Sequence, residues 1–194
     1  MPVSTASKPS WASLYEVASG QEGYVTTQQA AAAGYSGPLI HKHLAAGRIQ
    51  RIRRGIYRLV HVPAGDHEEL VVVWLWSEQA GVFSHQTALA LHGLSDVLPA
   101  RLHVTLPAAW ASRRLRTPHG VVVHHGDVAK ADRAWFGPVP VTSPRRTLLD
   151  CTGADVAPDL LRQATRQAAQ RGLVAKHDLE EVRRAARRAG GVGR

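Results

Sequence analysis

The stretch "RIQRIRRGIYRLV", from Arg48 to Val60, sets five arginines and one tyrosine around a single glycine. Its isoleucines and leucine recur as they do in two short β-strands, and "RRG" (Arg53 to Gly55) lies where a hairpin would turn. One interpretation is that these arginines merely keep an exposed strand edge from aggregating. They can also contact the phosphates of a nucleic acid, and the segments upstream favour this second interpretation.

Three helices are predicted before the hairpin. "SWASLYEVASGQEG" has apolar residues at helical spacing, "QQAAAA" can be capped by Thr26 or Thr27, and a third helix begins at Ser36 with Pro38 in its first turn. Only "GYS" separates the second helix from the third, which is typical of a helix-turn-helix. Three helices and a basic hairpin together predict a winged helix-turn-helix. In that arrangement one helix enters the major groove, and the hairpin, or wing, lies along flanking phosphates.

This arrangement predicts a set of DNA contacts. Ile40 and Leu44 lie four residues apart in the third helix and would pack inward, so the polar residues between them, His43 included, would face outward. Polar side chains on that face suit base edges or phosphates. The predicted DNA-binding residues are Thr27, Ser36, His41, Lys42, Arg48, Arg51, Arg53 and Arg54.

The overall charge agrees with a polyanionic partner. The 194 residues carry a formal net charge of +9, which usually indicates nucleic acid or an anionic membrane surface. The longest strongly apolar run, Leu70 to Trp76, is far shorter than the ~20 residues of a membrane span, and the first residues lack the apolar core of a secretory signal. Cys151 is the only cysteine, so no intrachain disulfide can form. The expected location is the reducing cytoplasm, with no membrane contact.

The charge is unevenly distributed along the chain. Residues 1–62 carry seven Lys and Arg against two Asp and Glu, residues 63–155 carry eight against nine, and residues 156–194 carry nine against four. The change after Val62 coincides with "HVPAGDHEE", a polar stretch with Pro and Gly. Two domains are therefore predicted, a winged helix-turn-helix over 1–62 and a second domain over 63–194.

The second domain is predicted to be a small mixed α/β domain with a helical tail, so the fold class is α+β. "RLHVTLP" and "GVVVHHGDV" alternate as strands do, Ser84 and Ser143 can cap helices, and "HEELVVVWLWSEQAG" suits a buried helix or a strand. A small antiparallel sheet covered by helices is expected. The tail predicts two helices broken at Gly172, with acids opening the second helix and arginines closing it.

The stretch "GYVTTQQAAAAGYSGPLIHKHLAAGRIQRIRRGIYRLV" resembles the amino-terminal winged-helix domain of the AbiEi family, the antitoxins and transcriptional regulators of type IV toxin-antitoxin systems. The segments Phe83 to Pro107 and Gly137 to Gly153 are similar to those that follow this domain in AbiEi-like proteins. The resemblance implies a repressor that binds repeats in its own promoter and counteracts a nucleotidyltransferase toxin, functionally rather than by stable contact. A regulator with no toxin is the alternative. Some relatives continue into a nuclease-like module that this sequence is expected to lack, so no enzyme is implied, and the oligomeric state stays open.

The remaining motifs give little indication of catalysis or metal binding. The triplets "HQT" (His85 to Thr87) and "HVT" (His103 to Thr105) are the kind that a two-histidine phosphoesterase pairs on neighbouring strands, but the first falls at a predicted helix start. His124 and His125 are adjacent, so they would point to opposite faces of a strand and cannot chelate one ion. No catalytic residue, metal site or cofactor is therefore predicted.

Two further groups of arginines are candidate anion contacts. Arg145 and Arg146 lie at a predicted helix start, where backbone donors also attract anions, although they can equally pair with Asp150 or Asp155. The second group forms a cationic ridge on the last helix, which can extend a DNA footprint or simply be solvated: Arg183, Arg184, Arg187 and Arg188.

Overall fold

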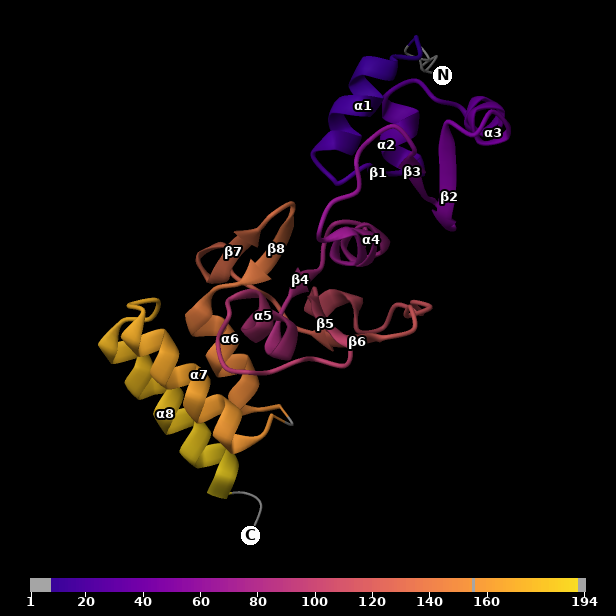
Figure 1. Cartoon of the computed structure of the whole chain (residues 1–194). Coiled ribbons are helices and arrows are strands. Elements are labelled where there is room, and N and C mark those ends of the chain that lie inside the picture. The colour runs from indigo at the N-terminus through magenta and orange to yellow at the C-terminus, as the bar shows by residue number, and fades with distance from the viewer. Residues whose placement is uncertain (1–7, 155, 192–194) are drawn as a thin grey trace. The chain divides into compact units, whose positions relative to one another are not determined.

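The computed structural model describes residues 8–154 and 156–191 and divides into two compact units, Met1–Gln79 and Ala80–Arg194. Most of the stretch considered for a secretory signal lies outside the described residues. Across the part that is described, no helix is long and apolar enough to cross a bilayer. Figure 1 shows the helices and strands of both units.

The first unit combines four helices with a three-stranded sheet. Its elements are α1 (Trp11–Ser19), β1 (Tyr24–Thr26), α2 (Thr27–Ala32), α3 (Gly37–Ala45), β2 (Ile49–Arg53), β3 (Ile56–Leu59) and α4 (Glu68–Trp76). The sheet has the order β1-β3-β2 with both pairs antiparallel. Leu14, Val25, Ile40 and Leu59 are buried together in one core that joins the first three helices to the sheet. The three predicted helices and the hairpin are thus confirmed as elements.

Local sequence signals explain where these elements begin and end. Thr26 caps α2 through a capping box, in which its hydroxyl accepts from the Gln29 N–H and the Gln29 side chain accepts from the Thr26 N–H. Gly34 and Gly47 follow α2 and α3 with φ of 85° and 66°, the left-handed conformation that glycine adopts without steric cost. Ser36 occupies the N-cap position of α3, but its side chain makes no capping hydrogen bond.

The segment "EELVVVWLW", for which sequence left helix and strand both open, is the helix α4. Six of its nine residues are buried, so it is apolar on nearly every face. It belongs to the first unit, because Arg58 on β3 forms an ion pair with Glu68 at 3.1 Å and the His67 N–H donates to the Glu22 carboxylate at 3.0 Å. The division after Gln79 therefore lies one helix beyond the boundary expected after Val62.

The second unit is built on a five-stranded sheet. Its strands are β4 (Val82–Phe83), β5 (Leu102–Leu106), β6 (Val121–His125), β7 (Arg133–Phe136) and β8 (Val139–Thr142), in the order β6-β5-β4-β8-β7. Two pairs, β4 with β8 and β5 with β6, are parallel, so the expected antiparallel sheet is in fact mixed. Residues 107–120 between β5 and β6 explain the second pair, because parallel neighbours need a crossover connection rather than a tight turn.

Helices supply the rest of the second unit's core. They are α5 (His85–Leu91), α6 (Pro144–Thr152), α7 (Pro158–Gln170) and α8 (Lys176–Gly191), with short 3-10 turns at Ala108–Trp110 and Lys130–Asp132. Leu89, Leu148 and Ala164 are fully buried where α5, α6 and α7 meet. Ser143 caps α6 as predicted, and Gly172, with φ of 65°, ends α7 at the predicted break.

The capping box of α2 gives a direct test of the first unit. Thr26→Ala removes the acceptor for the Gln29 N–H and should lower the free energy of unfolding by about 1 kcal/mol. Urea denaturation followed by circular dichroism measures the change. Gln28→Ala, an exposed change in the same helix, is the matched control. Equal decreases in the two variants would contradict a role for the cap.

Candidate nucleic-acid interface

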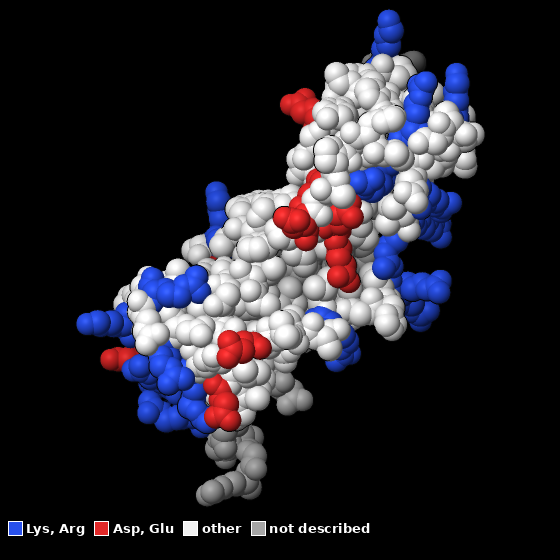
Figure 2. Space-filling view, in the orientation of Figure 1, with Lys and Arg blue, Asp and Glu red and all other residues white. Residues whose placement is uncertain are grey.

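The eight residues predicted to bind DNA are all exposed in the structure. They lie on three neighbouring parts of the first unit, namely the start of α2, the helix α3 and the hairpin of β2 and β3. Figure 2 shows Lys and Arg side chains gathered over α3 and β2 on this unit. The fold therefore presents the predicted residues to solvent, which is necessary for a contact with DNA.

The helix α3 has one buried face and one polar face. Ile40 is 3% exposed, whereas His41 and Lys42 are exposed. The prediction that His43 faces outward is wrong. Its ring is half-buried and stacks on Trp11 with ring centroids 5.2 Å apart, and it meets the edge of Tyr35 at 5.4 Å. An aromatic pocket from α1 and the α2–α3 turn therefore holds His43, and only its neighbours face solvent.

The hairpin separates its five arginines into two kinds. Arg58 donates to Glu68 at 3.1 Å and to the Val62 carbonyl at 3.2 Å, so its charge is already paired within the unit. The other four remain exposed on β2 and at its two ends: Arg48, Arg51, Arg53 and Arg54. The exposed cations are thus those predicted to contact phosphates, and the paired one is not among them.

The tip of the hairpin is attached to α2. The Thr27 N–H donates to the Gly55 carbonyl at 2.9 Å, and the Thr27 hydroxyl donates to the same oxygen at 3.4 Å. Gly55 itself has φ of 78°, which a residue with a Cβ adopts only with strain. These bonds fix the tip of the hairpin relative to the start of α2.

Arg145 and Arg146 are engaged by carboxylates in the second unit. Arg146 pairs with Asp150 at 2.7 Å, one of the two acids expected from sequence, while Asp155 lies outside the described residues. Arg145 pairs with three acids, Glu181 at 2.6 Å, Asp178 at 2.9 Å and Asp132 at 3.4 Å. Hydrogen bonds to Glu181 and Asp150 raise the pKa of Arg145 and Arg146 respectively. Both guanidinium groups are therefore structural, and neither is proposed as an anion contact.

The four arginines of the ridge on α8 are exposed.

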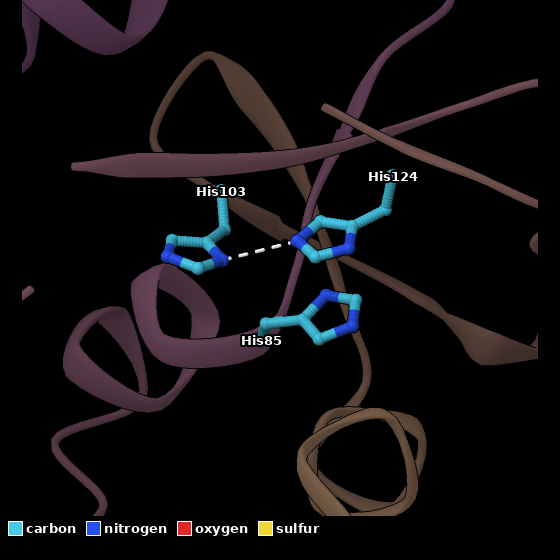
Figure 3. Close-up of side chains that lie close together, drawn as sticks. All are labelled: His85, His103 and His124. Carbon is cyan, nitrogen blue, oxygen red and sulfur yellow. Dashed lines mark hydrogen bonds between the residues drawn. The ribbon is translucent and has the colours of Figure 1, made fainter. Parts of the chain in front are cut away.

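Three histidines that are separate in the sequence lie together in the second unit. His85 begins α5, His103 lies on β5 and His124 lies on β6, and Figure 3 shows their rings facing one another. His103 Nδ1 is 3.0 Å from His124 Nε2, and the rings of His85 and His124 stack with centroids 3.6 Å apart. The H-x-T triplets indicate His85 and His103 but not His124, because the parallel register of β5 and β6 is invisible in the sequence.

These imidazoles are held in their neutral form. Burial, reinforced by the neighbouring histidines, lowers the pKa of His85 to about 3. Burial likewise lowers the pKa of His103 to about 4 and lowers that of His124. Neutral rings, each with an unprotonated nitrogen, are the form in which histidine accepts a hydrogen bond or binds a metal ion.

The threonine hydroxyls of the two H-x-T triplets are hydrogen-bonded within the fold. The Thr87 hydroxyl accepts from the backbone N–H of His103 at 2.7 Å, and the Thr105 hydroxyl donates to Ser84 Oγ at 2.7 Å. Both threonines are buried, at 2% and 5% exposure. Because these hydroxyl groups are committed within the fold, they are poorly placed to bind a phosphodiester, and phosphoesterase activity is not proposed.

Comparison with known proteins bears on the first unit. The chain is mixed α/β, and its first unit packs the helices α1, α2 and α3 against a sheet that contains the basic hairpin. Within it, residues 13–60 match the family described as "Transcriptional regulator, AbiEi antitoxin", which confirms the resemblance predicted from sequence for this segment. No curated protein matches the chain. Among solved structures, the crystal structure of RV2827C protein from Mycobacterium tuberculosis is similar at 20% identity, with a TM-score of 0.49, over 90% of this chain and 71% of that one.

The pocket of His43 predicts a pH dependence of stability. Burial, followed by the charges of Arg48 and Lys42, lowers the pKa of His43 below its ordinary value near 6.5. As the pH falls through that value, the unfolded chain therefore binds a proton before the folded chain does, and the free energy of unfolding decreases. His43→Phe keeps an aromatic ring against Trp11 and removes the titration. Urea unfolding between about pH 7 and pH 5 should show a smaller decrease in this variant, and identical slopes would contradict the assignment.

Proposed function

We propose that this chain is a DNA-binding transcriptional repressor of the AbiEi type, whose first unit acts as a winged helix-turn-helix. The observation that carries the proposal is the separation of charges on the hairpin. Four arginines remain exposed while Arg58 is neutralised by Glu68, all on or beside the segment that matches the AbiEi family model. Protection of a strand edge does not require four exposed guanidinium groups beside the polar face of α3, whereas contact with DNA phosphates does use them.

In this proposal α3 is the recognition helix. An α-helix fits the width of the major groove, and the exposed face of α3 offers donors and acceptors suited to base edges. His41 and Lys42 lie on that face, and the Ser36 hydroxyl, which makes no capping bond, lies at its start. These side chains would distinguish one sequence from another.

The hairpin is the proposed wing. Arg48, Arg51, Arg53 and Arg54 would lie along phosphates beside the groove that α3 enters, where they add affinity with little sequence preference. Thr27 holds the tip of the hairpin at Gly55, so the wing is preorganised. Preorganisation favours binding because less side-chain and loop entropy is lost when the complex forms.

The family assignment of residues 13–60 supports a regulatory role in the cytoplasm as an antitoxin. The proposed target is double-stranded DNA with repeats in the chain's own promoter. The proposed toxin is a nucleotidyltransferase that is counteracted functionally rather than by stable contact, and the alternative is an AbiEi-like regulator without a toxin. Co-expression with a nucleotidyltransferase encoded beside this chain separates the two, since only an antitoxin restores growth.

The wing predicts a steep dependence of DNA affinity on salt. Each neutralised phosphate releases counterions, so the logarithm of affinity should fall with the logarithm of salt concentration by about 0.9 per neutralised phosphate. Arg53→Ala with Arg54→Ala should lower this slope by about 0.9 for each phosphate that is no longer neutralised, as measured by fluorescence anisotropy with an upstream duplex. Arg114→Ala with Arg116→Ala makes the same change of charge at exposed positions for which no DNA contact is proposed, and it is the control. An equal decrease in both double variants would mean that net charge, rather than the wing, determines binding.

Substitutions on the exposed face of α3 should instead decrease the specificity of DNA binding. Lys42→Ala or His41→Ala should narrow the difference in affinity between the operator and random DNA by about 1 to 3 kcal/mol for each base that the side chain recognises. The wing double variant should weaken binding to both DNAs alike. Competition titrations with the two duplexes measure the difference. If the wing variant becomes less specific and the α3 variants do not, the roles of helix and wing are reversed.

A further inference from the structure

The three histidines of the second unit converge because of strand register. β5 and β6 are parallel with Thr105 opposite His124, and alternate residues of a strand share a face, so His103 and His124 project from the same face of the sheet. β4 ends beside β5, where the Ser84 N–H donates to the His103 carbonyl at 3.1 Å, and His85 follows directly. Three separate elements thus deliver one imidazole each to the same place (Figure 3).

The backbone of His85 is constrained at this point. Its φ is 53°, a left-handed conformation that costs a residue with a Cβ about 1 kcal/mol or more. The neighbouring Ser84 is fully buried, and its hydroxyl group contacts both Thr105 and His85 Nδ1 rather than capping α5. The fold therefore maintains a strained residue in order to place this ring beside the other two.

The spacing of the ring nitrogens suits a metal ion. One ligand atom from each histidine lies within 4.8 Å of the other two. A tetrahedral zinc ion with bonds of about 2.0–2.1 Å requires nitrogens about 3.3 Å apart, and the His103–His124 pair is already at 3.0 Å. The His85 ring stacks on His124, so it has to rotate before its own lone pair can point to the same ion.

We propose that His85, His103 and His124 form a binding site for one divalent transition-metal ion, with Zn²⁺ as the preferred occupant. A set of three imidazoles without thiolate or carboxylate ligands selects zinc and its neighbours over Mg²⁺ or Ca²⁺, which prefer oxygen. Three protein ligands leave a fourth position for water or for a donor atom of a partner. All three ligands belong to the second unit, whereas the residues of the proposed DNA interface belong to the first.

A half-buried carboxylate on α6, that of Asp150, supports the proposal. Asp150 acts electrostatically on His124, and one of its oxygens, Oδ2, is buried without a hydrogen-bond partner among the described residues. Its other oxygen accepts from Arg146 at 2.7 Å. Carboxylates beside metal-bound histidines commonly orient the ring and strengthen it as a ligand.

Titration of the full-length chain with Co²⁺ tests the site. After treatment with a chelator, the protein should bind one Co²⁺ per chain and develop the visible absorption bands of a four-coordinate ion, which Zn²⁺ then displaces. His103→Gln and His124→Gln should abolish these bands. Asp150→Asn should weaken binding on the order of 10-fold, as expected when the partner of a metal ligand is removed.

The chain supplies a matched control in His125. It follows His124 on β6, is exposed, and points to the opposite face of the sheet. His125→Gln should therefore bind Co²⁺ as the unchanged protein does. Circular dichroism establishes that each variant folds. If a ligand variant does not fold, NMR of the unchanged protein replaces it, and Zn²⁺ should shift the ring nitrogens of His85, His103 and His124 alone.

Three results would overturn the proposal. The first is the absence of four-coordinate Co²⁺ bands in the unchanged protein. The second is undiminished binding in folded His103→Gln and His124→Gln, which would place the ion on other histidines of the chain. The third is an NMR response to Zn²⁺ that spares these three rings. The three histidines would then be a hydrogen-bonded structural group.

Discussion

The pairing of β3 on both edges is the constraint on which the first unit depends. β3 bonds to β1 on one side and to β2 on the other, so its backbone groups are satisfied only if both neighbours are in place. β1 leads directly into α2, and β2 follows α3. A single four-residue strand therefore fixes the basic hairpin against two helices, and its last residue, Leu59, is fully buried. The proposed wing is consequently an integral part of a small sheet rather than a free flap.

Local signals in the sequence were sufficient to predict the first three helices and the hairpin of this unit, but they did not predict β1 and left α4 open between helix and strand. The capping residue Thr26, the glycines after α2 and α3, and the alternation around Gly55 all act through neighbours a few residues away. The burial of His43 was not predictable in this way, because it depends on a stack with Trp11 from another helix. The division after Gln79 was not predicted for the same reason, since α4 joins the first unit through contacts with residues of β3 and the α1–β1 turn.

The second unit shows where such reasoning stops. Its strands β5 and β6 were expected from their alternation, whereas β4 and β7 were not, and the parallel pairing of β5 with β6 depends on how residues 107–120 cross the sheet. Strand geometry alone predicts that His124 and His125 point to opposite faces of the sheet. The neighbours of His124 depend instead on how β6 is aligned with β5, and the sequence does not specify that alignment. Histidines that are compared in pairs along one helix or strand therefore could not reveal the cluster of His85, His103 and His124, which come from three different elements.

The ion pair of Arg58 with Glu68 has a consequence for anyone who transplants this unit into a fusion protein. A module cut after Val62 would contain the three helices and the hairpin but would lack α4 and, with it, the carboxylate that neutralises Arg58. The freed guanidinium would add one more cation to the hairpin, and the apolar surface that α4 covers would be exposed. Such a module would aggregate more readily and would bind DNA with less sequence selectivity than the complete first unit. Ending the module at Gln79 retains the built-in counterion.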